Sequence, residues 1–208
     1  DLGADAAEAV LARALLVPVL SIRAAGSILI IGVILRYRRQ SARSVGFRGD
    51  TLALNVLIGI AAVAVAFGLS VATNLLLWLA WPELPDQMME NARRIVDMVP
   101  KLHPLGFAAV AVMIGVYEEL LFRGFLMTRL RRASGSWVVA VLISTAIFTT
   151  LHALDQTLAA LVPITILSVV FSVATIWRRS IVPAIIAHTL WNFCQFLYLY
   201  AAPEDVWT

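Results

Sequence analysis

Long apolar runs separated by short polar loops are the feature that most restricts the fold of this chain. A helix of about 20 apolar residues crosses the hydrocarbon core of a bilayer. The chain of 208 residues is 61% hydrophobic and only 14% charged, whereas soluble domains have about 45–50% apolar and about 25% charged residues. The sequence therefore predicts an all-α, polytopic transmembrane helix bundle of about six spans, forming one integral membrane domain over residues 1–208. The expected spans are 9–35, 52–81, 105–126, 137–154, 157–177 and 181–200.

The loops on the two sides of this predicted bundle differ in charge. Those after the first, third and fifth spans are rich in arginine, whereas the other loops hold acids such as Asp86, Glu90 and Asp155. The positive-inside rule then predicts that both termini lie outside the cytoplasm. Between residues 82 and 104, apolar side chains recur at near-helical spacing, which indicates an amphipathic helix lying on the membrane surface.

The first span is the least regular, because Arg13, Pro18 and Arg23 interrupt it. Arg13 can extend to an interface, but Arg23 lies too deep to do so easily. We expect either that Arg23 faces the bundle interior or that the helix breaks near Pro18. The chain does not begin with Met, which is compatible with its being part of a longer natural sequence.

The third span contains Val-Tyr-Glu-Glu-Leu-Leu-Phe-Arg-Gly at residues 116–124, with two adjacent carboxylates and an arginine inside an apolar run. Each ionised group costs a few kcal/mol in such a segment, so we expect each to serve pairing or chemistry. Glu119 and Arg123 share a helix face and are predicted to form a structural ion pair. Glu118 points about 100° away. It is left without an obvious partner, and we predict that it is the catalytic residue.

Two later spans carry polar or aromatic residues at the same spacing. Phe148 and His152 in the fourth span share a face, as do His188 and Asn192 in the sixth. Counted from the basic ends of their helices, the polar groups and Glu118 lie roughly 12 to 24 Å deep, with His152 the deepest. We predict a single polar cavity in which Glu118 faces His152, and which opens toward the basic side. Its expected lining is Glu118, His152, His188 and Asn192.

The chemistry that such a set permits is hydrolysis. A glutamate within hydrogen-bond reach of a water can take its proton, and an imidazole such as His152 can orient that water. The amide of Asn192 and the ring of His188 can donate hydrogen bonds to an oxyanion. Two histidines and a glutamate also suffice for an open catalytic zinc site, with Glu118, His152 and His188 as ligands. The chain has no His-Glu-x-x-His motif, so the spacing leaves the metal-free and zinc mechanisms both open.

Taken in order, these motifs resemble those of the CAAX-protease and bacteriocin-processing (CPBP or Abi) family of intramembrane endopeptidases. They read Glu118-Glu119-x-x-x-Arg123, Phe148-x-x-x-His152 and His188-x-x-x-Asn192, and the resemblance covers about residues 105–200. The loop Ser-Val-Gly-Phe-Arg at 44–48 is also similar to one often seen in the family. The resemblance implies that Glu118 is the water-activating base with His152 beside it. It further implies that His188 and Asn192 complete the site, and that the Glu119–Arg123 pair is structural.

Eukaryotic members of that family remove the last three residues of prenylated CAAX proteins, while bacterial members mature peptides or have no known substrate. The resemblance thus implies an intramembrane endopeptidase that hydrolyses a peptide bond with glutamate-activated water. We expect a multi-pass protein of a bacterial or archaeal cytoplasmic membrane. Its expected partners are the bilayer and a peptide or protein substrate within it, prenylated or not, and no nucleic acid. The resemblance specifies no cofactor, and zinc is the candidate if a metal is bound.

Two other function classes stay open at this point. One is a catalytically idle scaffold or regulator of the same fold, in which the polar residues only join helices. The other is a proton-coupled transporter that uses the buried charges as a relay. The transporter is disfavoured because the sequence shows no paired discontinuous helices at matching positions of two halves.

Overall fold

The computed structural model describes residues 2–48 and 51–201, and every regular element in these ranges is a helix. The all-α prediction is confirmed. Arg13 lies outside the residues whose side chains are described. The elements are α1 Leu2–Tyr37, η1 Ala42–Val45, α2 Leu52–Trp78, α3 Leu84–Met98, α4 Pro104–Glu119, η2 Leu120–Leu126, α5 Met127–Ser134, α6 Trp137–His152, α7 Leu158–Arg178 and α8 Val182–Ala201.

Five helical segments are long and apolar enough to cross a membrane. They are Ala14–Tyr37, Leu52–Trp78, Pro104–Ser134, Leu158–Arg178 and Val182–Ala201. The remaining predicted span, α6, is apolar but has only 16 residues. At about 1.5 Å per residue it is shorter than the ~30 Å hydrocarbon core. The structure therefore supports a polytopic bundle with five full-length spans and one shorter apolar helix, where about six spans were expected.

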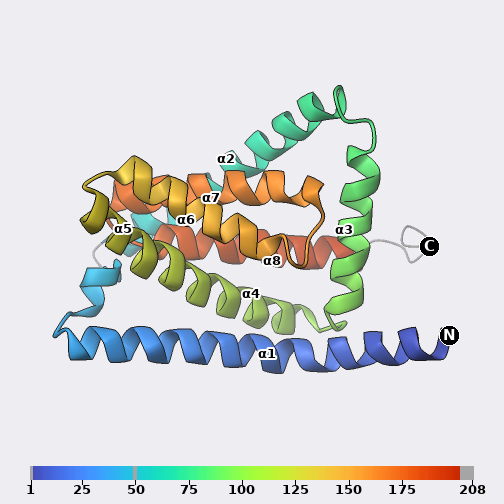
Figure 1. The fold of residues 1–208 in the computed structure, drawn as a ribbon, viewed down its shortest axis with the longest axis horizontal. Helices are drawn as coiled ribbons and strands as arrows, with labels where there is room; N and C mark the ends of the chain where they lie inside the picture. The colour runs from blue at the N-terminus through green and yellow to red at the C-terminus, as the bar shows by residue number, and fades with distance from the viewer. Residues whose placement is uncertain (1, 49–50, 202–208) are drawn as a thin grey trace.

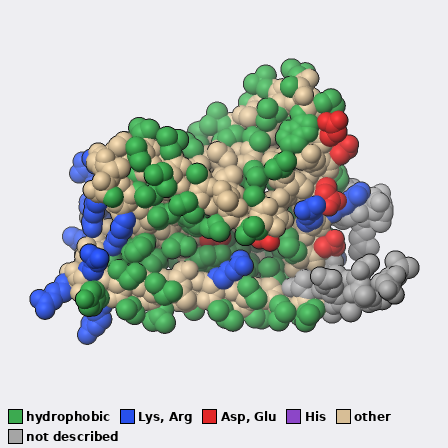
Figure 2. All heavy atoms as spheres, in the orientation of Figure 1, with side chains coloured by type: hydrophobic (Ala, Val, Ile, Leu, Met, Phe, Trp, Pro, Cys, Tyr) green, Lys and Arg blue, Asp and Glu red, His purple; other side chains and the backbone are tan. Residues whose placement is uncertain are grey.

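The long helices lie side by side, with α8 packed between α2, α4 and α7. Figure 1 shows α1 along one edge of the bundle, beside α4, and α3 crossing the ends of the other helices. Figure 2 shows basic side chains gathered at the end of the bundle where α5 lies, and most acidic side chains at the opposite end, beside α3. This separation follows the charge asymmetry of the loops. The orientation of the chain in a membrane stays a prediction.

The amphipathic segment predicted between residues 82 and 104 forms α3. Its inward face contains Leu84, Asn91 and Ile95, which are buried. The Asn91 side-chain oxygen accepts a hydrogen bond of 3.0 Å from the backbone N–H of Thr157, just before α7. Because this bond anchors α3 to the start of α7, α3 covers one end of the bundle.

The first span does not break at Pro18, since α1 continues without interruption from Leu2 to Tyr37. The expectation of a broken helix is therefore wrong. The side chain of Arg23 is exposed rather than packed between helices, and it lines an internal cavity of the bundle.

The third span departs from a regular α-helix at the charged motif. Between α4 and α5, residues 120–126 form the π-helix η2, which carries Arg123. Short π-helical turns inside α-helices are rare and frequently lie at functional sites. The sequence predicted a plain α-helix here, because helical periodicity does not distinguish the two hydrogen-bonding patterns over a single turn.

Candidate active site

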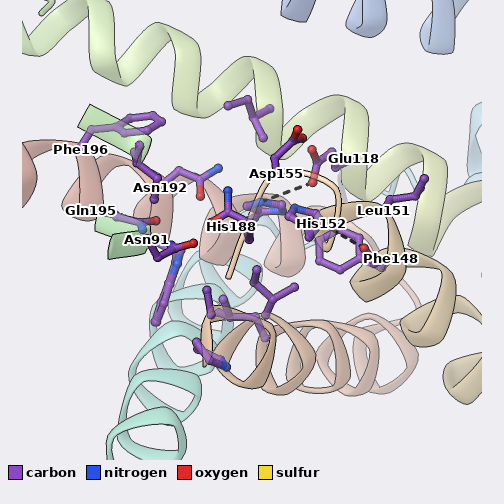
Figure 3. A pocket seen from close by; sticks show the side chains of 18 of the residues that line it. Asn91, Glu118, Phe148, Leu151, His152, Asp155, His188, Asn192, Gln195 and Phe196 are labelled. Atoms are coloured by element: carbon purple, nitrogen blue, oxygen red, sulfur yellow. Dashed lines mark hydrogen bonds and ion pairs between the residues drawn. The ribbon is translucent and has the colours of Figure 1, made fainter. Parts of the chain in front are cut away.

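A cavity of about 770 Å³ lies within the bundle, and side chains from α1, α2, α3, α4, α6, α7 and α8 line it. Most of these side chains are apolar, among them Leu16, Ile114 and Leu167. Figure 3 shows the polar groups that project into it. The structure brings together around this one cavity the four residues predicted for the site, Glu118, His152, His188 and Asn192.

Glu118 has different surroundings at its two carboxylate oxygens. The hydroxyl of the preceding residue, Tyr117, donates a hydrogen bond of 2.9 Å to Oε1. Oε2 is buried, has no hydrogen-bond partner among the described residues, and lies 3.8 Å from Nε2 of His188. That separation is too long for a direct hydrogen bond. A buried acceptor without a partner is costly, so Glu118 Oε2 is an acceptor ready to bind a polar group in the cavity.

His188 connects both glutamates of the motif. Its Nδ1 donates a hydrogen bond of 2.8 Å to Oε1 of Glu119, while its Nε2 is directed to Glu118. A carboxylate that accepts from one ring nitrogen fixes the orientation of the ring and the proton on that nitrogen, which leaves the other nitrogen directed into the cavity. Glu119 therefore orients His188 in addition to pairing with Arg123.

The Glu119–Arg123 ion pair is fully buried. Nη1 of Arg123 lies 2.7 Å from Oε1 of Glu119, and neither side chain is exposed. Nη2 of Arg123 donates a hydrogen bond of 3.1 Å to the carbonyl of Ser168 on α7, and the guanidinium lies over the ring of Phe148, 4.8 Å from its centre. The pair thus joins η2 to α6 and α7, and Glu119 turns away from the direction of Glu118, as expected from the helical spacing.

His152 is held by Phe148, the residue one turn before it on α6. The Nδ1 atom of His152 forms a hydrogen bond of 2.9 Å with the Phe148 carbonyl, and the two rings pack with their centres 4.4 Å apart. His152 lines the cavity, but the imidazole that interacts with Glu118 is that of His188. That Glu118 also faces His152 stays a prediction, and helix depth alone did not reveal which imidazole the buried Glu119 holds in place.

The lining of the cavity extends toward the acidic side of the bundle, and the predicted opening toward the basic side stays a prediction. Residues of α3, such as Met88 and Asn91, and the acidic-side loop residues Asp155 and Gln156 line it. At the basic end, a hydrophobic cluster that includes Ile31 fills the bundle. The depths of single residues could not predict this, because the packing of several helices decides which end is closed.

The cavity residues without a predicted catalytic or binding role include Tyr117, Arg23 and Asp155. Tyr117 was missed because neighbouring residues on a helix point about 100° apart, and nothing in the sequence indicated its bond to Glu118. Asp155 counted only as one of the acids in the loops. The deep position of Arg23 in an apolar run could have indicated a functional residue. The sequence-based interpretation instead explained it by helix packing or a helix break.

Close packing between α4 and α8 brings the motif glutamates near His188. A methyl group added at Gly115 would lie 2.7 Å from the hydroxyl of Thr189 and 3.2 Å from the carbonyl of Ile185. Only glycine fits there without moving α8, the helix that carries His188.

Gly115→Ala is therefore expected to destabilise the protein by about 1–3 kcal/mol, the usual cost of overpacking a well-packed interior. Thermal unfolding in detergent measures the effect. Gly68→Ala on α2 is the matched control, because nothing lies within 4 Å of a methyl group added there. Equal unfolding temperatures for the two variants would contradict this view of the α4–α8 contact.

The three residues named as zinc ligands do not gather as a ligand set. Among the residues that the structure describes, no three His, Cys, Asp or Glu side chains lie close enough together to hold a metal ion. One nitrogen of His188 is engaged by Glu119, which leaves Nε2 to face the cavity. In this arrangement, Glu118, His152 and His188 do not fit a zinc site.

Comparison with known proteins gives one match. The model of the family described as type II CAAX prenyl endopeptidase Rce1-like matches residues 100–194. This range contains the whole candidate site, including Glu118, His152, His188 and Asn192. No curated protein and no solved structure matched the chain.

Proposed function

We propose that this integral membrane protein hydrolyses a peptide bond with water activated by Glu118, because residues 100–194 match the model of the Rce1-like family of type II CAAX prenyl endopeptidases. The family match confirms the resemblance drawn from the motifs and supports a membrane-embedded peptidase. The assignment to Glu118 depends mainly on one observation. Its buried Oε2 lies 3.8 Å from His188 in a cavity that the other site residues line, and it has no hydrogen-bond partner among the described residues.

In the proposed reaction, Glu118 takes a proton from a water while the water oxygen attacks the carbonyl carbon of the scissile peptide. The carbonyl becomes a tetrahedral oxyanion. Asn192, which lies one turn after His188 on α8, donates to it from its amide group. The C–N bond then breaks, and Glu118 returns the proton to the leaving amine. His152 holds the attacking water on the side of the cavity where α6 ends.

His188 is the second donor to the oxyanion. With its Nδ1–H bound to Glu119, it offers a hydrogen bond into the cavity only when Nε2 also carries a proton. Glu119 serves the reaction indirectly, by holding the orientation of His188.

The proposed substrate is a peptide or protein embedded in the bilayer. The cavity is lined mainly by apolar side chains, which favours an apolar peptide segment and also accepts a lipid group such as a prenyl chain. The test is to incubate the purified protein in lipid vesicles with membrane peptides and to identify new termini by mass spectrometry. New termini in the wild-type sample that are absent with Glu118→Gln support the proposal, and their absence from both contradicts it.

No step of this reaction passes through a metal ion, which gives a second prediction. Treatment with a strong chelator is expected to leave the rate of peptide hydrolysis unchanged, because Glu118 and His188 act directly on water and carbonyl. The measurement is the rate before chelation, after chelation and after zinc is added back. Loss of hydrolysis on chelation with recovery on zinc addition would overturn the metal-free reaction while leaving the peptidase assignment in place.

A further inference from the structure

Arg23 is a charged side chain deep in a candidate membrane span, and the proposed reaction does not use it. It belongs to α1 within the candidate span Ala14–Tyr37, and its exposed side chain lines the same cavity as Glu118. A guanidinium at such a depth in a membrane is costly unless it pairs with another group or faces a polar cavity, and it indicates a functional site by default.

The acidic residues of the motif are engaged elsewhere. Glu119 binds Arg123 and His188, and Glu118 accepts from Tyr117 and faces His188. Among the described residues, no ion pair joins Arg23 to an acidic side chain. Arg23 lines the same cavity as Tyr117 and Glu118. Its positive charge therefore faces the cavity of the reacting groups and is available to a ligand.

The position of Arg23 along the bundle indicates which ligand can reach it. Arg36 marks the basic end of α1, and the helical rise places Arg23 about 20 Å from it along the helix. Counting to Arg129, Glu118 lies about 16 Å from it, about 4 Å closer. Arg23 is thus displaced from Glu118 in the direction in which the cavity extends, toward α3. In Figure 2, acidic atoms are visible inside a hollow above α1, and a basic side chain lies at its edge. A lipid phosphate at the basic interface lies too far away to be its partner.

From this placement we infer that Arg23 binds a carboxylate of the peptide substrate and so selects which peptides are cleaved, an inference that rests on the proposed function. Guanidinium groups bind carboxylates with two parallel hydrogen bonds. A peptide that passes Glu118 and continues toward α3 runs beside Arg23. It can offer its C-terminal carboxylate or the side chain of an Asp or Glu residue. Both have the same chemistry, and experiment distinguishes them.

The test uses three matched peptides that differ only in the anion: one with a free C-terminal acid, its C-terminal amide, and the amide with an Asp in place of an Asn near the cleavage site. The wild-type enzyme is expected to prefer a carboxylate-bearing peptide by about tenfold or more in kcat/KM, chiefly through KM, because the contact persists from substrate to transition state. Arg23→Gln removes the preference and Arg23→Lys keeps part of it. Arg36→Gln is the control, because Arg36 is exposed on the same helix and does not line the cavity.

The results separate the two carboxylates and the competing roles. A preference for the free acid alone identifies the C-terminus, and a preference for the Asp peptide identifies a side chain. If Arg23→Gln lowers kcat equally for all three peptides and shifts the pH profile, Arg23 supports the charge of Glu118 and the inference is wrong.

If the wild type cleaves no peptide, the proposed function fails. Binding of the same peptides to Glu118→Gln protein then decides the inference. Tighter binding of a carboxylate form, abolished by adding Arg23→Gln, supports it, and equal binding contradicts it.

Discussion

Replacing Glu118 by glutamine is expected to abolish peptide hydrolysis while the protein still folds. A positioned general base contributes about 10²- to 10⁴-fold to the rate, and an amide cannot take a proton from water. Glutamine keeps the size of the side chain, and its carbonyl can still accept the 2.9 Å hydrogen bond from Tyr117. The measurements are the cleavage rate of a membrane peptide and the unfolding temperature of the same preparation.

The matched control for this variant is Glu90→Gln on α3. Glu90 is half-exposed and pairs with Arg94 at 2.9 Å on the same helix, in an arrangement common on protein surfaces. The control is expected to keep full activity. Near-normal turnover by Glu118→Gln would remove Glu118 from the reaction. An inactive wild type that still binds membrane peptides would favour the scaffold alternative.

The second large effect is expected from Arg123→Met, which should reduce stability by about 3–5 kcal/mol. That value is typical for removal of one partner from a buried ion pair in soluble proteins. Arg123 has no exposed side-chain surface, and its loss leaves the carboxylate of Glu119 buried with His188 as its remaining hydrogen-bond partner. It also removes the hydrogen bond to the Ser168 carbonyl. Denaturant unfolding in detergent micelles measures the change.

Two companion variants show whether the unpaired charge of Glu119 causes the loss of stability in Arg123→Met. Combining Arg123→Met with Glu119→Gln removes both charges and is expected to recover part of the lost stability. Arg94→Met breaks an exposed pair on α3, which is worth only about 0.3–0.5 kcal/mol. If Arg123→Met cost no more than Arg94→Met, the buried pair would not be structural. A stable but inactive Glu119→Gln would instead assign Glu119 a direct part in the reaction.

The sequence was sufficient for most of the helices and for four of the polar residues at the cavity, Glu118, His152, His188 and Asn192. Apolar runs set the spans, and spacing of four residues on one helix predicted the Glu119–Arg123 pair, which lies at 2.7 Å. Both features depend on one helix at a time. The exception is α6, whose 16 residues make it shorter than the other apolar helices.

Contacts between helices were harder to predict. The bridge from His188 to both glutamates depends on how α8 rotates against α4, and the direction of the cavity depends on which end the apolar side chains fill. The role of Tyr117 required a hydrogen bond between neighbouring residues, which helical face rules do not anticipate. These features are set by the packing of helices against one another. The spacing of residues along a single sequence does not reveal that packing.

The most direct test of glutamate-activated hydrolysis is cleavage of a membrane peptide in water labelled with oxygen-18. If Glu118 activates water for direct attack on the peptide bond, the new C-terminal carboxylate carries one labelled oxygen with the wild-type protein. Glu118→Gln then gives no product under the same conditions. Labelled product formed equally fast by Glu118→Gln would contradict the central role of Glu118, and unlabelled product would contradict direct attack by water.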